Sequence, residues 1–335
     1  MVSSSGMAAA IEAYDFSANS VTVVGYGFMG KHYVQALRAL GVGQIHVCSR
    51  SKEPLNQLDG ITGVTTTAGG YHALSRQAHP GELGIVATTT ADLVNAAEHL
   101  ANLGFRKVLI EKPVSLWSAE IDRLAELLDS LGVEGSSAYN RLAYPSFCEV
   151  VGLTDTEGGI TSCVYTFTEM IQPDWPNLYS TEVLARWGVA NSLHPIGMAH
   201  GLIGLPSDWS GRRSGALPWH PSGAIFVGSG ISDQDIPFSY QADWGSKGRW
   251  SVEVNTSEAS YRLCPLEKLY RKTLALGEWE ELPVTTFYPD LKVGIAEEVA
   301  AILSAEVRQF TPLISMKQTA SLTAYGEQVF GYETP

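Results

Sequence analysis

Gly25, Gly27 and Gly30 have the spacing of a phosphate-binding turn, between an apolar run at residues 21–24 and a helical pattern that begins near Phe28. The first glycine permits a tight turn, the second lets a pyrophosphate approach the backbone, and the third lets helix and strand pack closely. The helix N-terminus then offers N–H groups and partial positive charge to the phosphates. We therefore expect a dinucleotide site rather than a purely structural glycine-rich turn. Its predicted contacts are Gly25, Gly27, Phe28, Met29 and Gly30.

The end of the next predicted strand indicates which cofactor this turn would hold. The run "HVCSRSK" places Ser49, Arg50, Ser51 and Lys52 where a site for NAD usually has an acidic residue, about twenty residues beyond the glycines. A carboxylate there would repel a 2′-phosphate, whereas a guanidinium and two hydroxyls would bind one. Ser49 and Arg50 therefore favour NADP(H) over NAD(H). The alternative is that Arg50 and Lys52 are only solvated surface charges.

The tripeptide Glu111-Lys112-Pro113 is a third candidate, within the run "FRKVLIEKPVSL". It follows residues 107–110, which are expected to form a parallel strand, so it falls at the edge of the sheet where ligands bind. A lysine at that edge is able to hydrogen-bond a substrate oxygen, although most lysines are solvated surface groups. We predict that Lys112 is catalytic and that Glu111 and Pro113 lie against the cofactor.

His194 is the candidate proton donor or acceptor in the second half of the chain, within the helical stretch "GVANSLHPIGMAHGLIG". An imidazole titrates near neutral pH, and hydride transfer to or from a carbinol carbon requires a proton to move at its oxygen. The alternative is a histidine that only fills space. His200 is expected to be structural. His194, His200 and His220 lack the spacing of zinc ligands, so no metal is predicted.

Two different patterns surround these residues. From about residue 21 to 138, short apolar runs alternate with amphipathic helical patterns, which indicates a Rossmann fold: a doubly wound parallel sheet covered on both faces. After about residue 150, β-branched and aromatic runs separated by turn residues predict a large, open, mostly antiparallel sheet. The strands of the first sheet are expected at 21–24, 44–48, 84–87, 107–110 and, more weakly, 132–135.

These patterns predict an α/β domain followed by an α+β domain. We expect a loosely held N-terminal extension over residues 1–20 and an NAD(P)-binding domain over residues 21–138. Residues 139–335 are expected to form a domain for substrate binding and oligomerisation. Its last helical pattern, near residues 316–330, is expected to pack back on the first domain.

Composition limits the partners of the chain. A net charge of −13 argues against nucleic acid and anionic membranes, which both need a cationic face. No apolar run approaches the eighteen or so residues of a membrane span, and the first twenty residues lack the basic segment of a signal peptide. The 4 cysteines are far apart, which favours reduced thiols in a cytoplasmic protein. A small-molecule substrate is the expected partner.

The glycine turn, the E-K-P tripeptide, the histidine helix and the predicted C-terminal sheet together resemble the glucose–fructose oxidoreductase / inositol dehydrogenase / MocA-like (Gfo/Idh/MocA) family over residues 21–330. The resemblance implies that Lys112 lies between nicotinamide and substrate and that the peptide bond before Pro113 is cis. It also implies that Thr88 and Thr89 form the turn beside the nicotinamide, although Thr89 replaces the family's usual proline. Family members often pair through the open sheet, so a homodimer or homotetramer is expected.

The resemblance also suggests residues that contact the substrate. In the family, the chain crosses into the second domain along the substrate cleft, and here that crossover is "SAYNRLAYPSF". Tyr139, Asn140 and Arg141 are therefore predicted to contact substrate, with Arg141 pairing with a phosphate or carboxylate. Tyr144 is predicted to stack on a sugar ring. Arg186, in the loop before the histidine helix, is predicted to cover the substrate.

The histidine helix departs from the family pattern D-x-G-x-H-x-x-D. Ala190 stands in the first Asp position and Gly197 in the second, so the usual Asp–His couple is absent. Asn191 lies three residues before His194, which is one turn of an α-helix. Asn191 is therefore predicted to lie beside the substrate and to orient His194 by hydrogen bonding.

The predicted function is an NADP(H)-dependent oxidoreductase that interconverts a hydroxyl and a carbonyl on a sugar, sugar nucleotide or cyclitol. One alternative is an imine or enamine reductase of the same family, since Ala190 breaks the alcohol-oxidising couple. The other alternative is a cofactor-binding regulator without catalysis. The retention of Lys112 and His194 argues against that second alternative.

Overall fold

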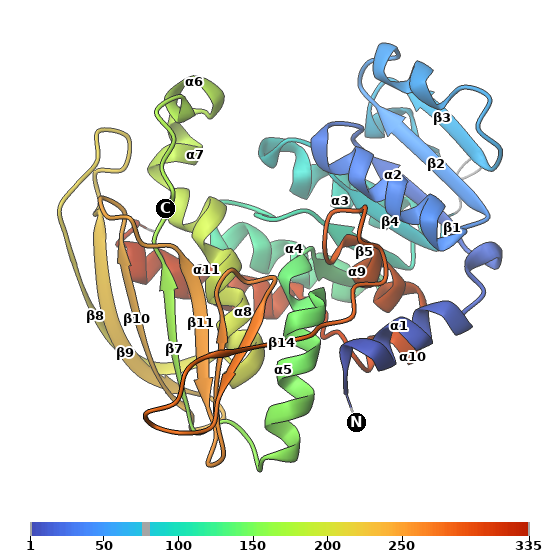
Figure 1. The fold of residues 1–335 in the computed structure, drawn as a ribbon. Coiled ribbons are helices and arrows are strands. Elements are labelled where there is room, and N and C mark those ends of the chain that lie inside the picture. The colour runs from blue at the N-terminus through green and yellow to red at the C-terminus, as the bar shows by residue number, and fades with distance from the viewer. Residues whose placement is uncertain (1, 76–80, 334–335) are drawn as a thin grey trace. The chain divides into compact units, whose positions relative to one another are not determined.

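The computed structural model describes residues 2–75 and 81–333, and the chain divides into two compact units (Figure 1). The parallel-sheet unit comprises Ala8–Ala143 and Phe287–Ala320. The antiparallel-sheet unit comprises the residues up to Met7, Tyr144–Thr286 and the residues from Ser321. The segment Phe287–Ala320, which we expected in the second domain, thus belongs to the unit that contains the parallel sheet.

Within the described residues, seven strands form the first sheet in the order β15-β6-β5-β4-β1-β2-β3. They are β1 (Ser20–Val24), β2 (Gln44–Ser49), β3 (Val64–Ala68), β4 (Leu83–Val86), β5 (Lys107–Ile110), β6 (Glu134–Ser137) and β15 (Ile314–Ser315). Strands β1 to β6 run parallel, and β15 pairs antiparallel with β6. The order 3-2-1-4-5-6 is that of dinucleotide-binding sheets, and it confirms the predicted Rossmann fold.

Strand β3 was not predicted from the sequence. It is an edge strand, and its residues "VTTTA" are partly or fully exposed. The prediction relied on apolar runs, which mark strands that are buried on both faces of a parallel sheet. The run of β-branched residues in β3 is the signal that would have found it.

Helices cover both faces of the parallel sheet. They are α2 (Phe28–Leu40), α3 (Leu93–Leu103), α4 (Ser118–Leu131), α9 (Ile295–Leu303) and α10 (Ala305–Arg308). Helices α3 and α4 pack on the face that carries Val24, Val86 and Ile110. Helix α2 lies on the face that carries Val23, and α9 packs against α2. Every residue of α9 is buried, so this helix is part of the interior of the parallel-sheet unit despite its late position in the chain.

The first twenty residues differ from the loosely held extension that we expected. Ser4–Ala13 form helix α1, and Phe16–Ala18 form a 3-10 turn before β1. Met7 and Ile11 lie four residues apart on one face of α1, and each is only 2% exposed. This is the spacing of the apolar face of a helix, and the alanines around it concealed it in the sequence.

The second sheet has eight strands among the described residues, in the order β14-β13-β12-β11-β7-β10-β9-β8. They are β7 (Ser162–Phe167), β8 (Pro206–Ser214), β9 (Ile225–Ser232), β10 (Pro237–Asp243), β11 (Trp250–Asn255), β12 (Ser260–Leu263), β13 (Leu269–Lys272) and β14 (Glu280–Leu282). Neighbouring strands are antiparallel except for β7 and β10. The predicted large and mostly antiparallel sheet is therefore confirmed.

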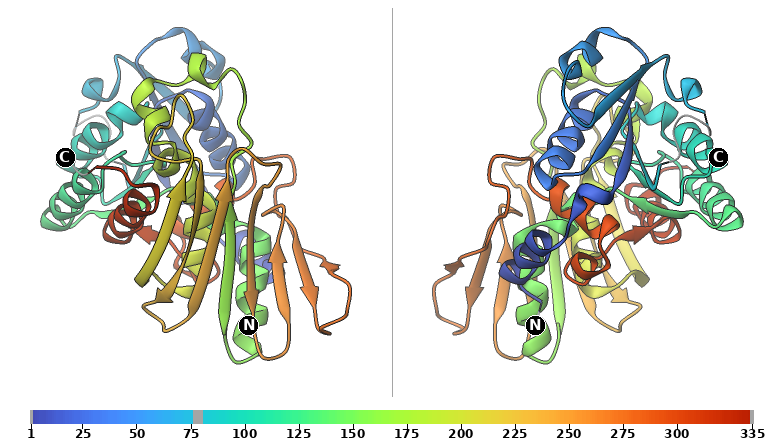
Figure 2. Two further views of the ribbon diagram at one scale, coloured as in Figure 1. Left: turned by 90° about the vertical axis from the view of Figure 1, so that its left-hand side faces the viewer. Right: turned by 90° about the vertical axis from the view of Figure 1, so that its right-hand side faces the viewer.

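The two faces of the antiparallel sheet differ. Besides α9 and α10, the α- and π-helices that follow β6 among the described residues are α5 (Pro145–Thr156), α6 (Trp175–Leu178), α7 (Thr181–Ala185), the π-helical turn η6 (Gly188–Ser192), α8 (Leu193–Ile203) and α11 (Met316–Phe330). On one face, α8 packs on β7 and β11, and Tyr325 of α11 is hydrogen-bonded to Tyr165 of β7 at 2.7 Å. The strands face the viewer in the left view of Figure 2. Exposed apolar side chains lie on the side opposite Tyr165: Val164, Ile225, Val227 and Ile231.

Candidate functional site

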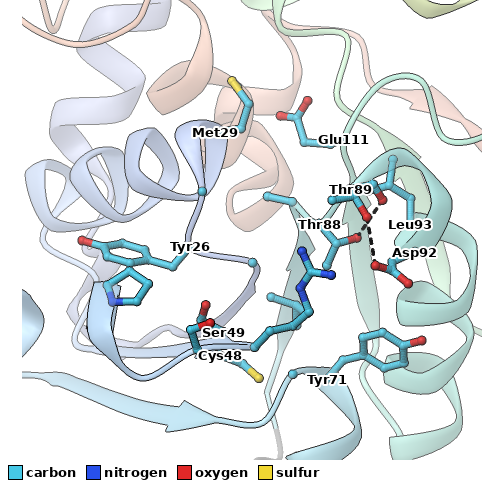
Figure 3. Close-up of a pocket in the computed structure, with 18 of the residues that line it drawn as sticks. Tyr26, Met29, Cys48, Ser49, Tyr71, Thr88, Thr89, Asp92, Leu93 and Glu111 are labelled. Atoms are coloured by element: carbon cyan, nitrogen blue, oxygen red, sulfur yellow. Dashed lines mark hydrogen bonds between the residues drawn. The ribbon is translucent and has the colours of Figure 1, made fainter. Parts of the chain in front are cut away.

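A cavity of about 680 Å³ lies at the carboxyl ends of the parallel strands, within the parallel-sheet unit (Figure 3). Its walls come from the segments that directly follow β1, β2, β3, β4 and β5. In a doubly wound sheet, ligands bind at this edge, where the strand order reverses between β1 and β4. In the view of Figure 3, Met29 and Glu111 lie toward one end of the cavity, and Ser49 and Tyr71 lie toward the other.

The cavity collects most of the residues that the sequence predicted for a cofactor. Those that line it are Gly25, Gly27, Phe28, Met29, Ser49, Arg50, Thr88, Thr89 and Glu111, together with the predicted catalytic Lys112. Gly30 and Pro113 were also predicted but do not line it. The cavity therefore joins the glycine turn and the lysine at a single edge of the sheet.

The three glycines of the turn meet different surroundings. Gly25 has a φ of +99°, and a Cβ atom there would collide with the backbone of Ala87. A Cβ atom at Gly30 would collide with the carbonyl group of Gly25. At Gly27, the N-cap of α2, no atom of the described residues other than Gly27 and its chain neighbours lies within 4 Å of the Cβ position. Packing within the protein thus requires Gly25 and Gly30, whereas the open space at Gly27 fits the approach of a pyrophosphate.

The charge around the cavity also fits a ligand that carries phosphates. The first N–H groups of α2 have no partner within the helix, and the helix dipole places partial positive charge at this end. The first turn of α2 contains no acidic residue. Among the described lining residues, Asp92 and Glu111 are the carboxylates. Asp92 accepts a hydrogen bond from the hydroxyl of Thr89 at 2.9 Å, which fixes the turn after β4.

The end of β2 presents hydroxyls and a guanidinium to the cavity. Ser49, Arg50 and Ser51 line it, and Arg50 is exposed. The N–H groups of Gly69 and Gly70, which follow β3, each donate to the carbonyl oxygen of Ser49 at 3.0 Å. These bonds hold the ends of β2 and β3 together and so fix the backbone from which Arg50 extends.

Glu111 holds the backbone of the predicted catalytic lysine. Its carboxylate accepts hydrogen bonds from the hydroxyl of Tyr33 in α2 at 2.6 Å and from the N–H of Lys112 at 3.2 Å. Burial raises the pKa of Glu111, and these two hydrogen bonds oppose the shift. The Lys112–Pro113 peptide bond is cis, as the family resemblance implied. Lys112 lies at the carboxyl end of β5, where it lines the cavity.

The residues predicted from the crossover segment make internal contacts in the parallel-sheet unit. The side-chain amide of Asn140 donates to the carbonyl oxygen of Val293 at 3.0 Å, and Arg141 donates to the side-chain oxygen of Asn140 at 2.8 Å. Tyr139 is buried. None of these three residues lines the cavity described above, and their contact with a substrate stays a prediction.

Arg186 and Tyr144, of the antiparallel-sheet unit, are also engaged internally. Arg186 forms a 2.5 Å ion pair with Glu327 of α11, and the two side chains are 7% and 3% exposed. The guanidinium of Arg186 also lies over the ring of Tyr332, 4.7 Å from its centroid. The hydroxyl of Tyr144 is 3.5 Å from the carboxylate of Glu267. Arg186 therefore balances the buried charge of Glu327, a role that sequence spacing alone did not reveal, and its contact with a substrate stays a prediction.

Asn191 and His194 are separated by a change of helix type. Asn191 lies in the π-helical turn η6, and His194 lies in the first turn of α8. The prediction assumed α-helical spacing between them. The side-chain amide of Asn191 donates to the carboxylate of Glu169 at 2.8 Å. The ring of His194 is half-buried and lies 5.9 Å from the ring of Trp250, between centroids.

His200 and His220 have structural surroundings. His200 is buried, and burial lowers its pKa to about 4. One ring nitrogen of His200 is 2.8 Å from the carbonyl oxygen of Gly204. His220 is buried too, with ring nitrogens 2.7 Å from the carbonyl oxygen of Gly223 and 2.6 Å from the hydroxyl of Tyr332. In the described part of the chain, no group of three or more His, Cys, Asp or Glu side chains is arranged to hold a metal ion.

The sequence analysis missed several residues of the two regions. Tyr71 and His72 line the cavity after β3, and they were missed because β3 itself was not predicted. Tyr26 lines the cavity from within the glycine turn. Glu169 was missed because a single acidic residue after a predicted strand carries no signal of its own. Only its buried position, 3% exposed, distinguishes it from a surface carboxylate.

A comparison with family models agrees with this geometry. Residues 19–139 match the model described as "Oxidoreductase family, NAD-binding Rossmann fold" of the Gfo/Idh/MocA group. This part of the chain belongs to the Gfo/Idh/MocA oxidoreductase family. The match spans the strands from β1 to β6 and the whole cavity. The chain is therefore an NAD(P)-dependent oxidoreductase.

Solved structures of other proteins share the fold over nearly the whole chain. One is the UDP-N-acetylglucosamine 3-dehydrogenase from Acidithiobacillus ferrooxidans, with a TM-score of 0.70, 14% identity, and coverage of 93% of this chain and 96% of that chain. Another is an oxidoreductase from Agrobacterium radiobacter in complex with NAD+, L-tartaric acid and magnesium, with a TM-score of 0.72, 14% identity, and coverage of 93% and 95%. A protein proposed to be a myo-inositol dehydrogenase, from Sinorhizobium meliloti 1021, has a TM-score of 0.69, 15% identity, and coverage of 92% and 95%. At these identities the likeness establishes the fold.

No curated protein sequence matches the chain. Among the helices of the described residues, none has both the length and the apolar character that crossing a bilayer requires.

Proposed function

We propose that the protein is an NADP(H)-dependent oxidoreductase that interconverts a hydroxyl and a carbonyl on a sugar, sugar nucleotide or cyclitol. The observation that carries the proposal is that Lys112 lines the same cavity as the glycine turn of Gly25 and Gly27. A cation fixed at the carboxyl end of a strand, in a cavity suited to a dinucleotide, is placed to act on a group that reacts with that dinucleotide.

The preference for NADP(H) rests on the end of β2. Ser49, Arg50 and Ser51 line the cavity where an NAD site would present a carboxylate to the ribose. Arg50 supplies a guanidinium that is able to bind a 2′-phosphate through two hydrogen bonds, and the serine hydroxyls add donors. The 2′-phosphate is therefore the group that this segment would recognise.

The protein's own groups orient the substrate and move its proton. When bound, the nicotinamide accepts or supplies the hydride. Lys112 donates a hydrogen bond to the oxygen of the reacting carbon and stabilises negative charge on it. His194 takes the proton from that oxygen in the oxidative direction and returns it in the reductive direction. Glu111 keeps the backbone of Lys112 in place by accepting its N–H.

The substrate class is supported by the similar structures and not by a contact in this chain. Two of them are a dehydrogenase of UDP-N-acetylglucosamine and a protein proposed to act on myo-inositol. Both substrates carry secondary hydroxyls on a six-membered ring. A polyhydroxylated ring is therefore the first class to test, with a role in carbohydrate metabolism.

The face of the antiparallel sheet opposite Tyr165 suggests how copies associate. Val164, Ile225, Val227 and Ile231 are each more than a third exposed on that face. Clustered exposed apolar side chains mark interaction surfaces. We propose that two copies pair through this face, as a homodimer or half of a homotetramer. Sedimentation of wild type and of Val227→Lys tests the pairing, since a monomeric wild type would exclude it.

The proposed activity is tested by turnover and by binding. Purified protein is screened against free and nucleotide-linked keto-sugars, inososes and cyclic imines, and the oxidation of NADPH is followed. A thermal-shift screen with NADP+ present detects binders even where turnover is slow, because a ligand stabilises the folded state by mass action. Reduction of imines alone would favour imine reduction. Binding of NADPH with no turnover of any compound would favour a regulator.

A further inference from the structure

A buried carboxylate lies beside the histidine helix. Glu169 follows β7 and is 3% exposed. One of its oxygens accepts a hydrogen bond from the side-chain amide of Asn191 at 2.8 Å, and the other accepts one from the hydroxyl of Ser192 at 2.5 Å. Asn191 and Ser192 are the last two residues of the π-helical turn η6 (Gly188–Ser192), immediately before α8. One carboxylate therefore holds the end of that turn with both of its oxygens.

Such an arrangement is costly, so its geometry is informative. Burying a carboxylate is unfavourable unless its oxygens accept hydrogen bonds. A glutamine of the same shape would avoid the buried charge, but it would keep only one acceptor oxygen for two donors, because the other terminal atom is an NH2 group. A carboxylate at Glu169 offers a separate oxygen to each of Asn191 and Ser192, whereas a glutamine would turn an NH2 group toward one of these two donors. The charge therefore serves to fix the turn.

The turn that it fixes sets the start of the histidine helix. π-Helical turns carry an extra residue and recur at functional sites. The first residue of η6 is held as well, since the N–H of Gly188 donates to the hydroxyl of Tyr332 at 2.9 Å. His194 comes two residues after Ser192. The position of its imidazole thus depends on how both ends of η6 are held.

We propose that Glu169 is a positioning residue for His194: through Asn191 and Ser192 it fixes the turn from which the histidine helix starts. From the segment after β7, it supplies the carboxylate that the family pattern has at the position of Ala190. In the family pattern, the carboxylate is an Asp of the stretch before the histidine. Here that stretch carries the amide of Asn191, and the carboxylate that the amide contacts belongs to Glu169. This inference rests on the proposed function, in which His194 exchanges a proton with the substrate.

The contact between this amide and this carboxylate suggests a reciprocal experiment. Glu169→Gln removes the charge, and Asn191→Asp brings two carboxylates together. The two substitutions combined exchange carboxylate and amide across the same contact. We expect each single variant to lower kcat by about tenfold or more, with the dissociation constant for NADPH within about twofold of wild type. If the two substitutions acted independently, the kcat of the combined variant relative to wild type would equal the product of the two single relative kcat values. We expect it to be higher than that product by about threefold or more, because the two residues are in direct contact.

Glu157→Gln is the matched control. Glu157 is another poorly exposed acid of the antiparallel-sheet unit, and its carboxylate forms a 2.7 Å ion pair with Arg271 and accepts the hydroxyl of Tyr261 at 2.6 Å. Its loss should lower the melting temperature and leave the kcat of the folded protein near that of wild type. A general loss of stability is in this way separated from a loss of positioning at His194.

A readout without turnover makes the inference independent of the substrate. Nitrogen NMR of labelled histidine, with His194→Asn used to assign the resonance, reports the surroundings of the imidazole. Glu169→Gln should shift the ring resonances of His194 and leave those of the buried His200 unchanged. If wild type binds NADPH but reduces no compound, the proposed function fails, and this measurement still tests the positioning.

Two results would overturn the inference. One is a Glu169→Gln protein that loses only thermal stability and keeps the kcat and the His194 resonances of wild type. The other is a combined variant whose kcat, relative to wild type, is no higher than the product of the relative kcat values of the two single variants. If Glu169→Gln does not fold, Asn191→Ala removes the same hydrogen bond from the other side, and a wild-type His194 resonance in that variant also counts against the proposal.

Discussion

The two units hold their candidate functional groups in different ways. In the parallel-sheet unit the groups directly follow strands: the glycine turn follows β1, Arg50 follows β2, Thr88 follows β4 and Lys112 follows β5. A parallel sheet brings such segments to one edge by its topology. In the antiparallel-sheet unit, His194 lies on a helix that starts directly after a turn held by side chains, among them Glu169 from the segment after β7.

The difference predicts different responses to substitution. Around the cavity, the path of the backbone positions most of the candidate groups. A side chain that points into the cavity and is not packed in the interior is therefore replaceable without loss of the fold. Around the histidine helix, buried charged groups hold the elements together. Removing one partner there leaves an uncompensated group in a poorly solvated place, and the fold itself weakens.

The largest effect on stability should come from Arg186. Arg186→Met leaves the carboxylate of Glu327, which is 3% exposed, without its ion-pair partner. We expect the free energy of unfolding to fall by about 3–5 kcal/mol, measured by urea denaturation. Arg186→Met combined with Glu327→Leu should recover most of the loss, because replacing both charges removes the unpaired one. A single variant as stable as wild type would show that the ion pair is not essential to the unit.

Lys112 should show the opposite behaviour, a large effect on rate with little effect on stability. Lys112→Met removes a cation that lines the cavity but leaves Glu111 to hold the backbone. We expect kcat/KM to fall by about a hundredfold or more, the usual scale for one positioned group in proton transfer or charge stabilisation. NADPH affinity, from calorimetry, should stay near that of wild type. A rate within a few-fold of wild type would remove Lys112 from the mechanism.

The two units also differ in how much of each site could be predicted from the local sequence. The roles of Gly25, Gly27 and Lys112 were predicted because a turn or strand end within a few residues specifies them. Edge strand β3 was missed because its exposed threonines lack the apolar signal of a buried strand. Tyr71, which follows β3, was missed with it.

The histidine helix was predictable only in part, because contacts between distant residues decide it. His194 was identified because the helical stretch around it resembles the family pattern, but the bond that holds the π-helical turn joins Asn191 to Glu169, 22 positions away. The same holds for Arg186, whose partner is 141 positions away in α11. Spacing along one helix carries no information about a carboxylate that another element supplies.

Two glycines of the same turn provide a finer test of the backbone argument. Gly25→Ala should cost about 1–2 kcal/mol or more of stability, because φ is +99° and the new methyl group would meet the backbone of Ala87. Gly27→Ala should leave the melting temperature unchanged, since its Cβ position is open, and weaken NADPH binding by about tenfold. Differential scanning calorimetry and titration calorimetry measure the two quantities. Equal NADPH affinity in Gly27→Ala and wild type would contradict a phosphate at this position.

A buried acid of the parallel-sheet unit should affect stability and leave cofactor binding unchanged. Burial raises the pKa of Glu297, in α9, from 4.5 to about 7. Between these values the folded protein holds a proton that the unfolded chain has released, so stability should fall as the pH rises from about 4.5 to about 7. Glu297→Gln should therefore be more stable than wild type by about 1–3 kcal/mol at pH 8 and no more stable at pH 4. A stability difference between Glu297→Gln and wild type that is the same at pH 4 and pH 8 would contradict a raised pKa of Glu297 in the folded protein.

Titration calorimetry of the wild-type protein with NADPH and with NADH tests the central claim most directly. Ser49, Arg50 and Ser51 line the cavity at the end of β2, where we propose that the ribose of the cofactor binds. NADPH should therefore bind at least about tenfold more tightly than NADH, and Arg50→Ala should narrow the difference by about 1–3 kcal/mol, the contribution of a charged hydrogen bond. Equal affinities for the two cofactors in wild type, or binding of neither, would contradict the account.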